Sequence, residues 1–440
     1  MSSDYQSAPV DPTSSSVLAA QNLRLGLVDT ADASEFDAWL RANSRWIYDT
    51  DTADDSREAQ RDGAAYRRTT GVWDKTISEP GLPVATVSSW PAALTVPGST
   101  SVPAWAISAV TVSPTHRRRG IARALLESEL RTANALGLPL AMLTVSEATI
   151  YGRYGFAPSV MMADWRIDTR RAKWTGPIAT GRVHFASPES LRDIAPSIIE
   201  STRLDSPGDM ERWAALGDRL LGIGPDKDRA KKLRLVRYDD VEGEPQGFAA
   251  YTVTESGPDF SSHVLDVQYL AAATDDAYAG LWRYLIEMDL VATITAPLRS
   301  VDEAFKWQIS DFRAARTTVV VDHLWTRILD VAAALEGRRY SAPGRIVLDI
   351  SDDLGFADEL VLLEIGPDGR ASASPLTGEA PEDAAALSLS VADLSAIYLG
   401  GVTAAALVRA GRITELRPGS ADATDAAFRS PVTPWLSIWF

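Results

Sequence analysis

The chain has 440 residues, of which 45% are hydrophobic and 23% charged, and its formal net charge is -16. A chain of this length suggests about three domains, each long enough to bury a core. The chain has no cysteine, which excludes a disulfide scaffold, thiolate metal sites and a cysteine nucleophile. The absence of cysteine also fits a protein of a reducing compartment. The acidic balance argues against sequence-independent binding of nucleic acid and favours cationic small molecules as partners.

The N-terminus carries no recognisable targeting signal. It is rich in serine and holds no Lys or Arg before Arg24, whereas a signal peptide needs a basic start and an apolar core. We expect residues 1–21 to form a disordered tail and the protein to be cytoplasmic. Residues 80–115 carry no charge, but six prolines interrupt them, so they predict adjacent β-strands rather than a membrane span. The four histidines lie too far apart in sequence for a local metal motif, so no metal is expected.

A strand, a helix and a second strand are predicted in the first part of the chain. Apolar spacing predicts a helix over residues 33–46, before the uncharged strand block. A longer helix begins near Gly120, presents its apolar residues on one face and ends at Gly137. An apolar strand over residues 138–145 follows, so the order is that of a crossover unit.

The central part of the chain repeats this order. It opens with a strand-like run after Ser159, has a helical pattern over residues 188–203, and continues through strands into a helix that starts near Asp276. When that helix is aligned with the first, Gly280 falls on Gly120, while alanine and tyrosine replace the three arginines. The match fits a degenerate duplicate of the first part, and equally a chance likeness of two amphipathic helices.

The last part of the chain, from about Val301, contains no catalytic motif. Two alternating runs, RIVLDISDD and ELVLLEIGPDG, predict a β-hairpin, and a strand with helices follows. The chain closes with the apolar sequence PWLSIWF.

The strongest chemical motif joins a strand that ends at Val112 to the helix that begins near Gly120. The loop between them carries Arg117, Arg118 and Arg119. A helix N-terminus presents unpaired backbone N–H groups and the positive end of the helix dipole, and glycine lets an anion approach the backbone. Three arginines oppose that dipole if they only face solvent, so a bound pyrophosphate explains them better. The loop fits neither a GxxxxGK[ST] phosphate loop nor a GxGxxG dinucleotide motif.

This loop resembles the R/Q-x-x-G-x-A/G signature of the GCN5-related N-acetyltransferase superfamily, with Arg117, Gly120 and Ala122 at the fixed positions. The resemblance implies that the loop holds the pyrophosphate of acetyl-CoA and that the preceding strand splays from its neighbour and pairs with the pantetheine arm. A second likeness lies downstream, where Tyr151 is followed four residues later by Gly-Phe. In the superfamily, a tyrosine in that place sits beside the thioester sulfur. The alternative for Tyr151 is a packed core aromatic, which is how we interpret Tyr154.

Longer stretches narrow the resemblance to the enhanced intracellular survival (Eis) family. The similar segments are SAVTVSPTHRRRGIARALL, SEATIYGRYGF, LTVPG, LWRYLIEMD and LWTRILDVAAALEGRRY. The resemblance implies a mixed α/β (α+β) fold with two GCN5-related acetyltransferase-like domains, the second without cofactor, and a sterol-carrier-protein-like C-terminal domain. The expected boundaries are a disordered tail over 1–21, a catalytic domain over 22–158, a degenerate acetyltransferase-like domain over 159–300 and a sterol-carrier-protein-like domain over 301–440. The resemblance also implies acetyl-CoA-dependent acetylation of aminoglycoside amines at several positions by a homo-hexamer.

The resemblance assigns roles to single residues. Tyr151 is implied to be the general acid that protonates the departing CoA thiolate, and the terminal carboxylate of Phe440 the general base for the attacking ammonium. The residues implied to bind the cofactor are Val110, Thr111 and Val112 through their backbone, Arg117, Arg118, Arg119, Gly120, Ile121, Ala122 and Arg123 around the phosphates, and Ser146 and Glu147 beside the thioester. Family members often carry an aromatic residue where this chain has Ala109, so the shape of the acceptor pocket stays open.

Both acid–base roles are chemically reasonable. A free α-carboxyl group has a pKa of ~3.5 and is a weak base in water, but burial beside Trp435 and Trp439 would raise that pKa. A tyrosine, whose ordinary pKa is near ~10, is well matched to protonate a thiolate.

The acceptor is less clear from the sequence. The acidic residues Asp49, Asp51, Asp54 and Asp55 suit a polycation, although a solvated loop explains the cluster as well. One alternative function is a protein-lysine or polyamine N-acetyltransferase, which would turn over free aminoglycosides poorly. Another is a lipid-binding module with a vestigial acetyltransferase domain, which would not bind acetyl-CoA. The intact arginine loop and Tyr151 argue against this last alternative.

Overall fold

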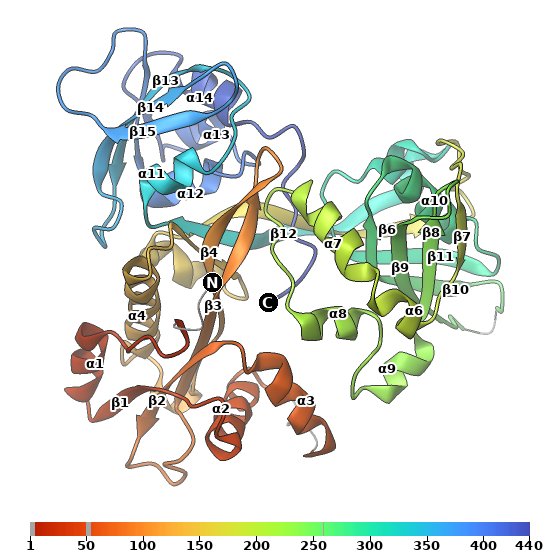
Figure 1. Cartoon of the computed structure of the whole chain (residues 1–440), viewed down its shortest axis with the longest axis horizontal. Coiled ribbons are helices and arrows are strands. Elements are labelled where there is room, and N and C mark those ends of the chain that lie inside the picture. The colour runs from red at the N-terminus through yellow and green to blue at the C-terminus, as the bar shows by residue number, and fades with distance from the viewer. Residues whose placement is uncertain (1–4, 50–53, 258) are drawn as a thin grey trace. The chain divides into compact units, whose positions relative to one another are not determined.

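The chain folds into two compact units (Figure 1). The computed structural model describes residues 5–49, 54–257 and 259–440. The first unit comprises residues up to 159, 324–431 and 439–440, and the second comprises residues 160–323 and 432–438. The domain boundary expected at residue 301 therefore falls within the second unit.

The N-terminal part of the first unit is a mixed sheet with strand order β1-β2-β3-β4-β5-β12. Its strands are β1 (Leu23–Leu27), β2 (Arg68–Asp74), β3 (Ala85–Val96), β4 (Thr100–Val112), β5 (Leu140–Thr144) and the C-terminal end of β12 (Ala315–Ile328). Neighbouring strands are antiparallel except β4 and β5, which are parallel and joined by helix α4 (Ile121–Ala135). Leu324 of β12 pairs with Thr144 of β5, so a segment from late in the chain closes this sheet.

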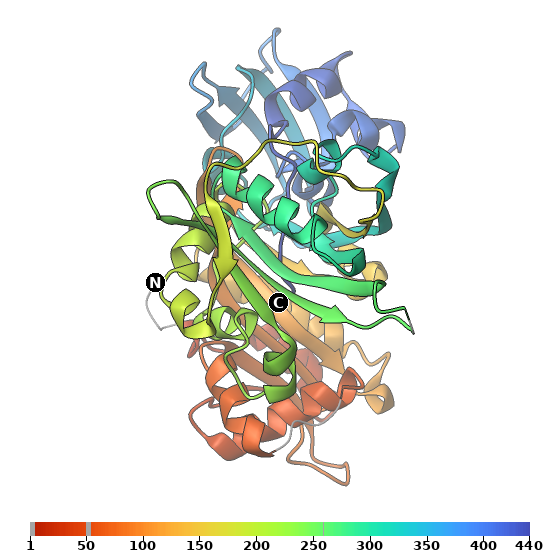
Figure 2. The ribbon, with the colours of Figure 1, turned by 90° about the vertical axis from the view of Figure 1, so that its right-hand side faces the viewer.

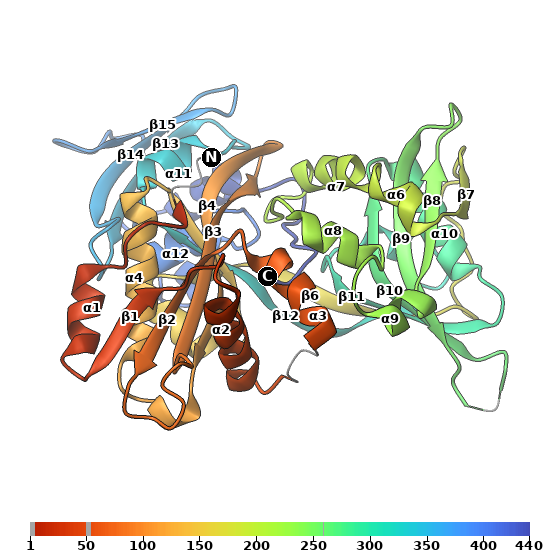
Figure 3. The same ribbon diagram turned by 60° about the horizontal axis from the view of Figure 1, so that its bottom comes forward.

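Helices cover both faces of this sheet (Figures 1 and 3). Helices α1 (Pro12–Ala19) and α4 lie on one face, and α2 (Ala33–Trp46), followed by α3 (Asp54–Ala64), lies on the other. The sheet and α4 enclose the main core, in which Trp105 and Leu125 are fully buried. Burying one such side chain stabilises a fold by about 1.5–3 kcal/mol. The helices and strands predicted in this part of the chain are confirmed.

Residues 12–19 contradict the disorder expected for the N-terminal tail, because they form α1. The Asp11 carboxylate caps this helix by accepting the backbone N–H of Ser14 at 2.7 Å, and it also accepts from Arg131 of α4 at 2.8 Å. Leu18 is fully buried in the main core. One cap, one ion pair and one buried leucine hold this segment, and its serine-rich composition did not reveal them.

The C-terminal part of the first unit is a smaller sheet with helices packed on it (Figure 2). Its strand order is β15-β14-β13-β16-β17, and β13 and β16 are parallel. The strands are β13 (Gly344–Ser351), β14 (Glu359–Ile365), β15 (Ala371–Pro375), β16 (Ala385–Ser390) and β17 (Thr414–Glu415), and the helices are α11 (Val331–Glu336), α12 (Val391–Ile397), α13 (Ala404–Arg409) and α14 (Ser420–Phe428). Gly344 pairs with Ile365, which confirms the predicted hairpin.

The sheet of the second unit repeats the strand order and directions of the first. Its order is β7-β8-β9-β10-β11-β6, with β10 and β11 parallel and the other neighbours antiparallel. The strands are β6 (Ala157–Asp168), β7 (Arg182–Phe185), β8 (Arg234–Asp239), β9 (Pro245–Thr254), β10 (His263–Ala272) and β11 (Val291–Arg299). The helices are α6 (Pro188–Arg192), α7 (Ala195–Leu204), α8 (Ala214–Leu220), α9 (Lys227–Lys232) and α10 (Asp275–Ile286). The predicted duplication of the fold is therefore present.

Two details of the second unit differ from the predictions. The single helix expected over residues 188–203 is two helices, because α7 restarts with Pro196 in its first turn, where the missing N–H is tolerated. The alignment of Gly280 with Gly120 is wrong, since Thr274 caps α10 while Gly280 lies inside that helix. Two amphipathic helices match in several registers, and only the caps show which one is right. None of the described helices is long and apolar enough to cross a membrane.

Candidate active site

The two parallel strands of the first sheet separate toward their C-terminal ends. The register that joins them ends where Ala106 of β4 lies opposite Met142 of β5. Strand β4 continues to Val112 and β5 to Thr144, so the backbone of β4 beyond Ala106 faces an opening instead of a paired neighbour. Backbone N–H and C=O groups at such an opening can bind the amides of an extended ligand.

A β-bulge bends β4 at this point. The register with β3 shifts there, which leaves Ala109 and Val110 opposite one residue of β3. Ala109 has φ +54°, a left-handed conformation that is strained for a residue with a Cβ atom. The Thr86 hydroxyl lies 2.8 Å from the Ala109 carbonyl and 2.6 Å from the Thr111 hydroxyl. These contacts hold Val110, Thr111 and Val112 along the opening, as the resemblance implies for the strand that meets the pantetheine arm.

The loop after β4 presents a helix N-terminus together with two arginines. Gly120 caps α4 with φ +72°, and a Cβ atom added there would meet nothing within 4 Å. Arg117 and Arg118 are exposed, and neither has a partner among the described residues. The first turn of α4, which begins with Ile121 and Ala122, carries no acidic residue. Its free N–H groups and the two guanidinium groups therefore suit a pyrophosphate.

The other two arginines of the motif are engaged within the protein. Arg119 donates to the backbone carbonyl of Gln21 at 3.2 Å, and its guanidinium group lies 3.6 Å from the Asp74 carboxylate. Arg123 pairs with Glu127 one turn further along α4, at 2.7 Å. Arg119 thus holds the loop in place, and Arg123 is paired with Glu127 through Nε.

Asp74, at the end of β2, holds the loop between β4 and α4. Its carboxylate accepts from the hydroxyl and the backbone N–H of Thr76, and it lies 3.1 Å from Nε2 of the buried His116. The hydrogen bonds from Thr76, followed by that from His116, hold the pKa of Asp74 well below its usual range. The other ring nitrogen of His116 lies 2.8 Å from the Thr115 hydroxyl. The ionised carboxylate therefore fixes both the imidazole and the loop that precedes α4.

Tyr151 ends the short helix α5 (Ala148–Tyr151), directly before the 3-10 turn η3 (Gly152–Tyr154). Its side chain is 7% exposed, and its ring meets Phe156 edge-on with 6.3 Å between ring centroids. Burial, reinforced by the negative charge of Glu147, raises the pKa of the Tyr151 hydroxyl. A phenol with a raised pKa stays protonated at neutral pH, so Tyr151 is suited to donate a proton. Tyr154 lies in the core, as predicted.

Ser146 and Glu147 are exposed and lie between β5 and α5. Helix α5 begins at Ala148, so Glu147 and not Ser146 occupies its N-cap position. The Glu147 side chain makes no cap hydrogen bond and instead accepts from the Thr149 hydroxyl at 3.2 Å. The start of the segment that carries Tyr151 is therefore weakly held.

The C-terminal residue lies at the end of β5. The Thr144 hydroxyl donates to the terminal carboxylate of Phe440 at 2.9 Å. The Phe440 ring meets Trp90 of β3 edge-on, with 5.8 Å between centroids. Trp90 itself packs against Tyr66 and under the Arg67 guanidinium. The terminal carboxylate is thus positioned where β4 and β5 separate.

The corresponding helix end in the second unit does not reproduce the anion site. Asp275 and Asp276 stand in the first turn of α10. Asp276 accepts from the backbone N–H and the hydroxyl of Thr180, and from the Tyr238 hydroxyl. Carboxylates at a helix N-terminus satisfy the dipole and repel a phosphate, so the N-terminus of α10 does not suit an anion as that of α4 does.

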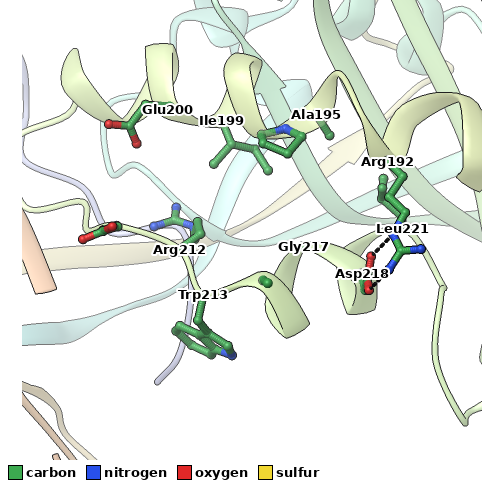
Figure 4. A pocket seen from close by; sticks show the side chains of 12 residues that line it. Arg192, Ala195, Ile199, Glu200, Arg212, Trp213, Gly217, Asp218 and Leu221 are labelled. Atoms are coloured by element: carbon green, nitrogen blue, oxygen red, sulfur yellow. Dashed lines mark hydrogen bonds and ion pairs between the residues drawn. The ribbon is translucent and has the colours of Figure 1, made fainter. Parts of the chain in front are cut away.

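A cavity of about 440 Å³ lies in the second unit between α7 and α8 (Figure 4). Trp213 forms part of its wall. Among its charged lining residues, Asp218 pairs with Arg192 at 2.8 Å, and Glu200 pairs with Arg203 at 2.5 Å. The cavity is therefore amphipathic, and neighbouring arginines offset these two carboxylates.

Sequence reasoning missed the residues that support the site, namely Thr144, Trp90, Asp74 and His116. A polar residue at the C-terminal end of a predicted strand beside the splay was a usable signal for Thr144. Trp90 lies in the uncharged stretch of residues 80–115, and no sequence pattern distinguishes it from its neighbours there. Of the predicted acidic cluster, Asp49 is exposed, whereas Asp51 and the side chains of Asp54 and Asp55 lie outside the described residues.

Splayed parallel strands, an arginine loop on a helix N-terminus and a buried tyrosine define a GNAT-type N-acetyltransferase. Family models agree, since an acetyltransferase (GNAT) domain matches residues 28–159 and again residues 208–328. A sterol carrier protein domain matches residues 331–437. The fold is therefore two acetyltransferase domains followed by a sterol-carrier-protein-like domain, and the resemblance found in the sequence is confirmed at this level.

Similar proteins narrow the assignment. The chain is 34% identical over 412 residues to an uncharacterized N-acetyltransferase of Streptomyces avermitilis, covering 91% of this chain and 96% of that protein. It is 34% identical over 353 residues to the N-acetyltransferase Eis of Mycobacterium tuberculosis, covering 77% of this chain and 81% of that protein. The crystal structure of Eis1 from Mycobacterium abscessus superposes with a TM-score of 0.79 at 28% identity, over 95% of this chain and all of that chain. The chain belongs to the Eis family of N-acetyltransferases.

Proposed function

We propose that this enzyme transfers the acetyl group of acetyl-CoA to primary amines of aminoglycosides, at more than one position. Membership of the family supports N-acetylation with acetyl-CoA as co-substrate. The net charge of -16 suits a cationic acceptor. The observation that carries the proposal is the terminal carboxylate of Phe440, held by Thr144 where β4 and β5 separate.

Acetyl-CoA has a defined place in this proposal. Its phosphates bind at Arg117, Arg118 and the first turn of α4, and its pantetheine arm lies along Val110–Val112. This arrangement agrees with the open backbone of β4 and with the two arginines that have no partner among the described residues. Ser146 and Glu147 then flank the thioester.

The proposed chemistry assigns one proton transfer to each of two groups. The Phe440 carboxylate takes a proton from the substrate ammonium, and the neutral amine attacks the thioester carbonyl carbon. As the C–S bond breaks, the Tyr151 hydroxyl gives its proton to the departing sulfur, and the nitrogen of the adduct releases its second proton, which returns to the tyrosinate through solvent. The raised pKa of Tyr151 supports this role because the phenol is protonated at the working pH. Each transfer by a placed group typically contributes 10²–10⁴-fold to the rate.

The proposal extends to the organisation of the protein. We assign catalysis to residues 22–158, a role without cofactor to 159–300 and a C-terminal domain to 301–440, in a cytoplasmic homo-hexamer. The acidic N-terminus of α10 supports the second assignment. Light scattering during gel filtration tests the hexamer.

The function is tested by release of CoA thiol from acetyl-CoA with tobramycin, kanamycin and spermidine as separate acceptors. The protein contributes no thiol signal, since it has no cysteine. One arm carries a single residue appended after Phe440, which moves the carboxylate, and the matched control is Phe440→Leu, which keeps the carboxylate and loses the ring. We expect the extension to abolish turnover while acetyl-CoA binding persists.

Each result has a distinct meaning. If the extended protein still turns over its substrate, the terminal carboxylate is not the general base. Turnover of spermidine alone points to a polyamine enzyme, and turnover of none of the three acceptors contradicts the proposed acceptor class. A protein that fails to bind acetyl-CoA would be a lipid-binding module with a vestigial acetyltransferase domain.

A further inference from the structure

The turn that follows Tyr151 is held from β12, the strand that closes the N-terminal sheet of the first unit. Nε of Arg327, on β12, donates to the backbone carbonyl of Tyr154 at 3.1 Å. Tyr154 is the last residue of η3, which continues directly from the helix that carries Tyr151. The contact therefore lies three residues from the proposed acid, on the same helical segment.

Arg327 is itself rigidly held. Its side chain is fully buried, and one terminal nitrogen donates to both carboxylate oxygens of Asp352 at 2.7 Å. The other terminal nitrogen donates to the Ile328 carbonyl, and the guanidinium carbon lies 5.0 Å from the Phe356 ring centroid. A planar fork with this many partners has one orientation available.

Asp352 ties the same guanidinium to a compact loop. Its two oxygens also accept the backbone N–H groups of Leu354, Phe356 and Ala357 at 2.9–3.1 Å. The side chains of Leu354 and Phe356 pack on the hydrophobic core cluster that contains Tyr151. The loop and the arginine thus form one support beneath the catalytic segment.

Gly155 shows how closely this support approaches. It has φ +82°, and a Cβ atom added there would lie 2.9 Å from Val391 of α12 and 3.1 Å from Nε of Arg327. Only glycine fits this turn, both for its backbone conformation and for the space available. This close approach holds the turn after Tyr151 in one position.

The opposite end of the segment lacks such support. Glu147 makes no side-chain cap hydrogen bond to α5, and the residues before Ile150 are exposed. Among the described residues the Tyr151 hydroxyl has no hydrogen-bond partner, so its position depends on the backbone and on packing against Phe156. The anchored end of the segment therefore decides where the hydroxyl points.

We propose that Arg327, locked by Asp352, is a positioning residue that sets the orientation of Tyr151 for proton donation. The Asp352 loop, in the sterol-carrier-protein-like part of the unit, thereby acts on catalysis through Arg327 without touching a substrate. This inference rests on the proposed role of Tyr151 as general acid. A purely structural clamp would instead support folding and leave the rate per folded molecule unchanged.

A double-mutant cycle separates the two readings. The variant Arg327→Met/Asp352→Asn removes both charges together, so no buried charge is left unpaired, and Asn keeps an acceptor for the loop. It is combined with Tyr151→Phe, and kcat and acetyl-CoA affinity are measured on the full-length protein and corrected for the folded fraction. A misplacement of about 1 Å costs up to about 100-fold in rate, so we expect kcat to fall about 10- to 100-fold with acetyl-CoA affinity within about twofold.

Coupling is the decisive readout. If Arg327 acts through Tyr151, the paired substitution should lower kcat by less than about threefold in the Tyr151→Phe background, because the acid is already absent there. The matched control is Arg338→Met, which alters another fully buried arginine of the first unit, whose terminal nitrogens donate to the Tyr398 and Phe428 carbonyls. We expect it to lower stability and leave kcat per folded molecule unchanged.

Several outcomes overturn the proposal. The same loss of kcat in both Tyr151 backgrounds, or an equal loss in Arg338→Met, makes Arg327 a structural residue only. A Tyr151→Phe variant with native kcat removes the proposed acid, and with it this inference. Should the paired variant not fold, Arg327→Lys keeps the charge beside Asp352 but loses the planar fork, and its smaller loss must likewise vanish in the Tyr151→Phe background.

Discussion

The hydroxyl of Thr144 donates a hydrogen bond of 2.9 Å to the terminal carboxylate of Phe440, which lies 296 residues further along the chain. Thr144 is the last residue of β5, at the point where β5 has separated from β4. Phe440 is held there by this hydrogen bond and by the edge-on contact of its ring with Trp90. The carboxylate is thereby placed in the opening that the proposed thioester occupies.

The first prediction concerns this hydrogen bond. Thr144→Val keeps the shape of the side chain and removes the donor. A hydrogen bond to a charged group contributes about 1.5–3 kcal/mol, so kcat should fall about 10- to 100-fold while the KM for acetyl-CoA stays near its native value. Steady-state kinetics with a saturating amine measure both quantities.

Thr132→Val is the matched control, because Thr132 donates to the Ser128 carbonyl inside α4 and meets neither proposed reactant. Thr144→Ser keeps a hydroxyl and should recover most of the activity. Equal kinetics for the Thr144→Val and native proteins would contradict a positioned carboxylate.

The second prediction concerns the pH dependence of Tyr151. Burial raises its pKa above the ordinary value of 10.0, so the phenol loses its proton only at higher pH. An enzyme that needs the protonated phenol should keep its kcat up to about pH 10 and lose it above that pH. In Tyr151→Phe, kcat should be at least about 100-fold lower and should lack this alkaline limb. Tyr154→Phe is the control, since Tyr154 is a core residue, and a native alkaline limb in Tyr151→Phe would assign that limb to another group.

The third prediction concerns Arg117 and Arg118, the two arginines of the loop that have no partner among the described residues. Arg117→Ala/Arg118→Ala should raise the KM for acetyl-CoA by about 10-fold or more at low salt, and less at high salt because both side chains are exposed and screened. The substrate S-acetylpantetheine lacks the pyrophosphate and should show the same KM with native and variant enzyme. If its KM rises as well, these arginines do not act on phosphate.

The fourth prediction concerns the stability contributed by Asp74. Hydrogen bonds from Thr76 and His116 lower its pKa in the folded state, so its contribution is fully present above the unfolded pKa of about 3.9 and is lost as the pH falls below it. The melting temperature of Asp74→Asn should lie below that of the native protein at neutral pH, and the two should converge on acidification. Calorimetry from pH 6 to pH 3 measures this. If the melting temperatures of the two proteins differ by the same amount over that range, these contacts do not lower the pKa of Asp74.

Much of the fold could be predicted because its signals are local. The helix over residues 33–46, the strand that includes Thr144 and the helix that begins after Gly120 follow from apolar spacing and from glycine and proline at their ends. The anion loop is contiguous, so its three arginines could be recognised together. Local signals failed where distant contacts decide the structure, as in α1, where Leu18 and the Asp11–Arg131 pair order a serine-rich segment.

The sequence by itself determined the family, the acetyltransferase class and the residues of the proposed acetyl-CoA loop, because those features lie within short stretches of chain. Only the tertiary structure decided that β12 closes the first sheet, that Thr144 and Trp90 hold Phe440, and that Arg327 reaches the turn after Tyr151. These contacts join residues separated by more than a hundred positions, and no periodicity or spacing in the sequence records which distant groups meet. Their partners are selected by packing and by the satisfaction of buried polar groups, which exist only once the chain has folded.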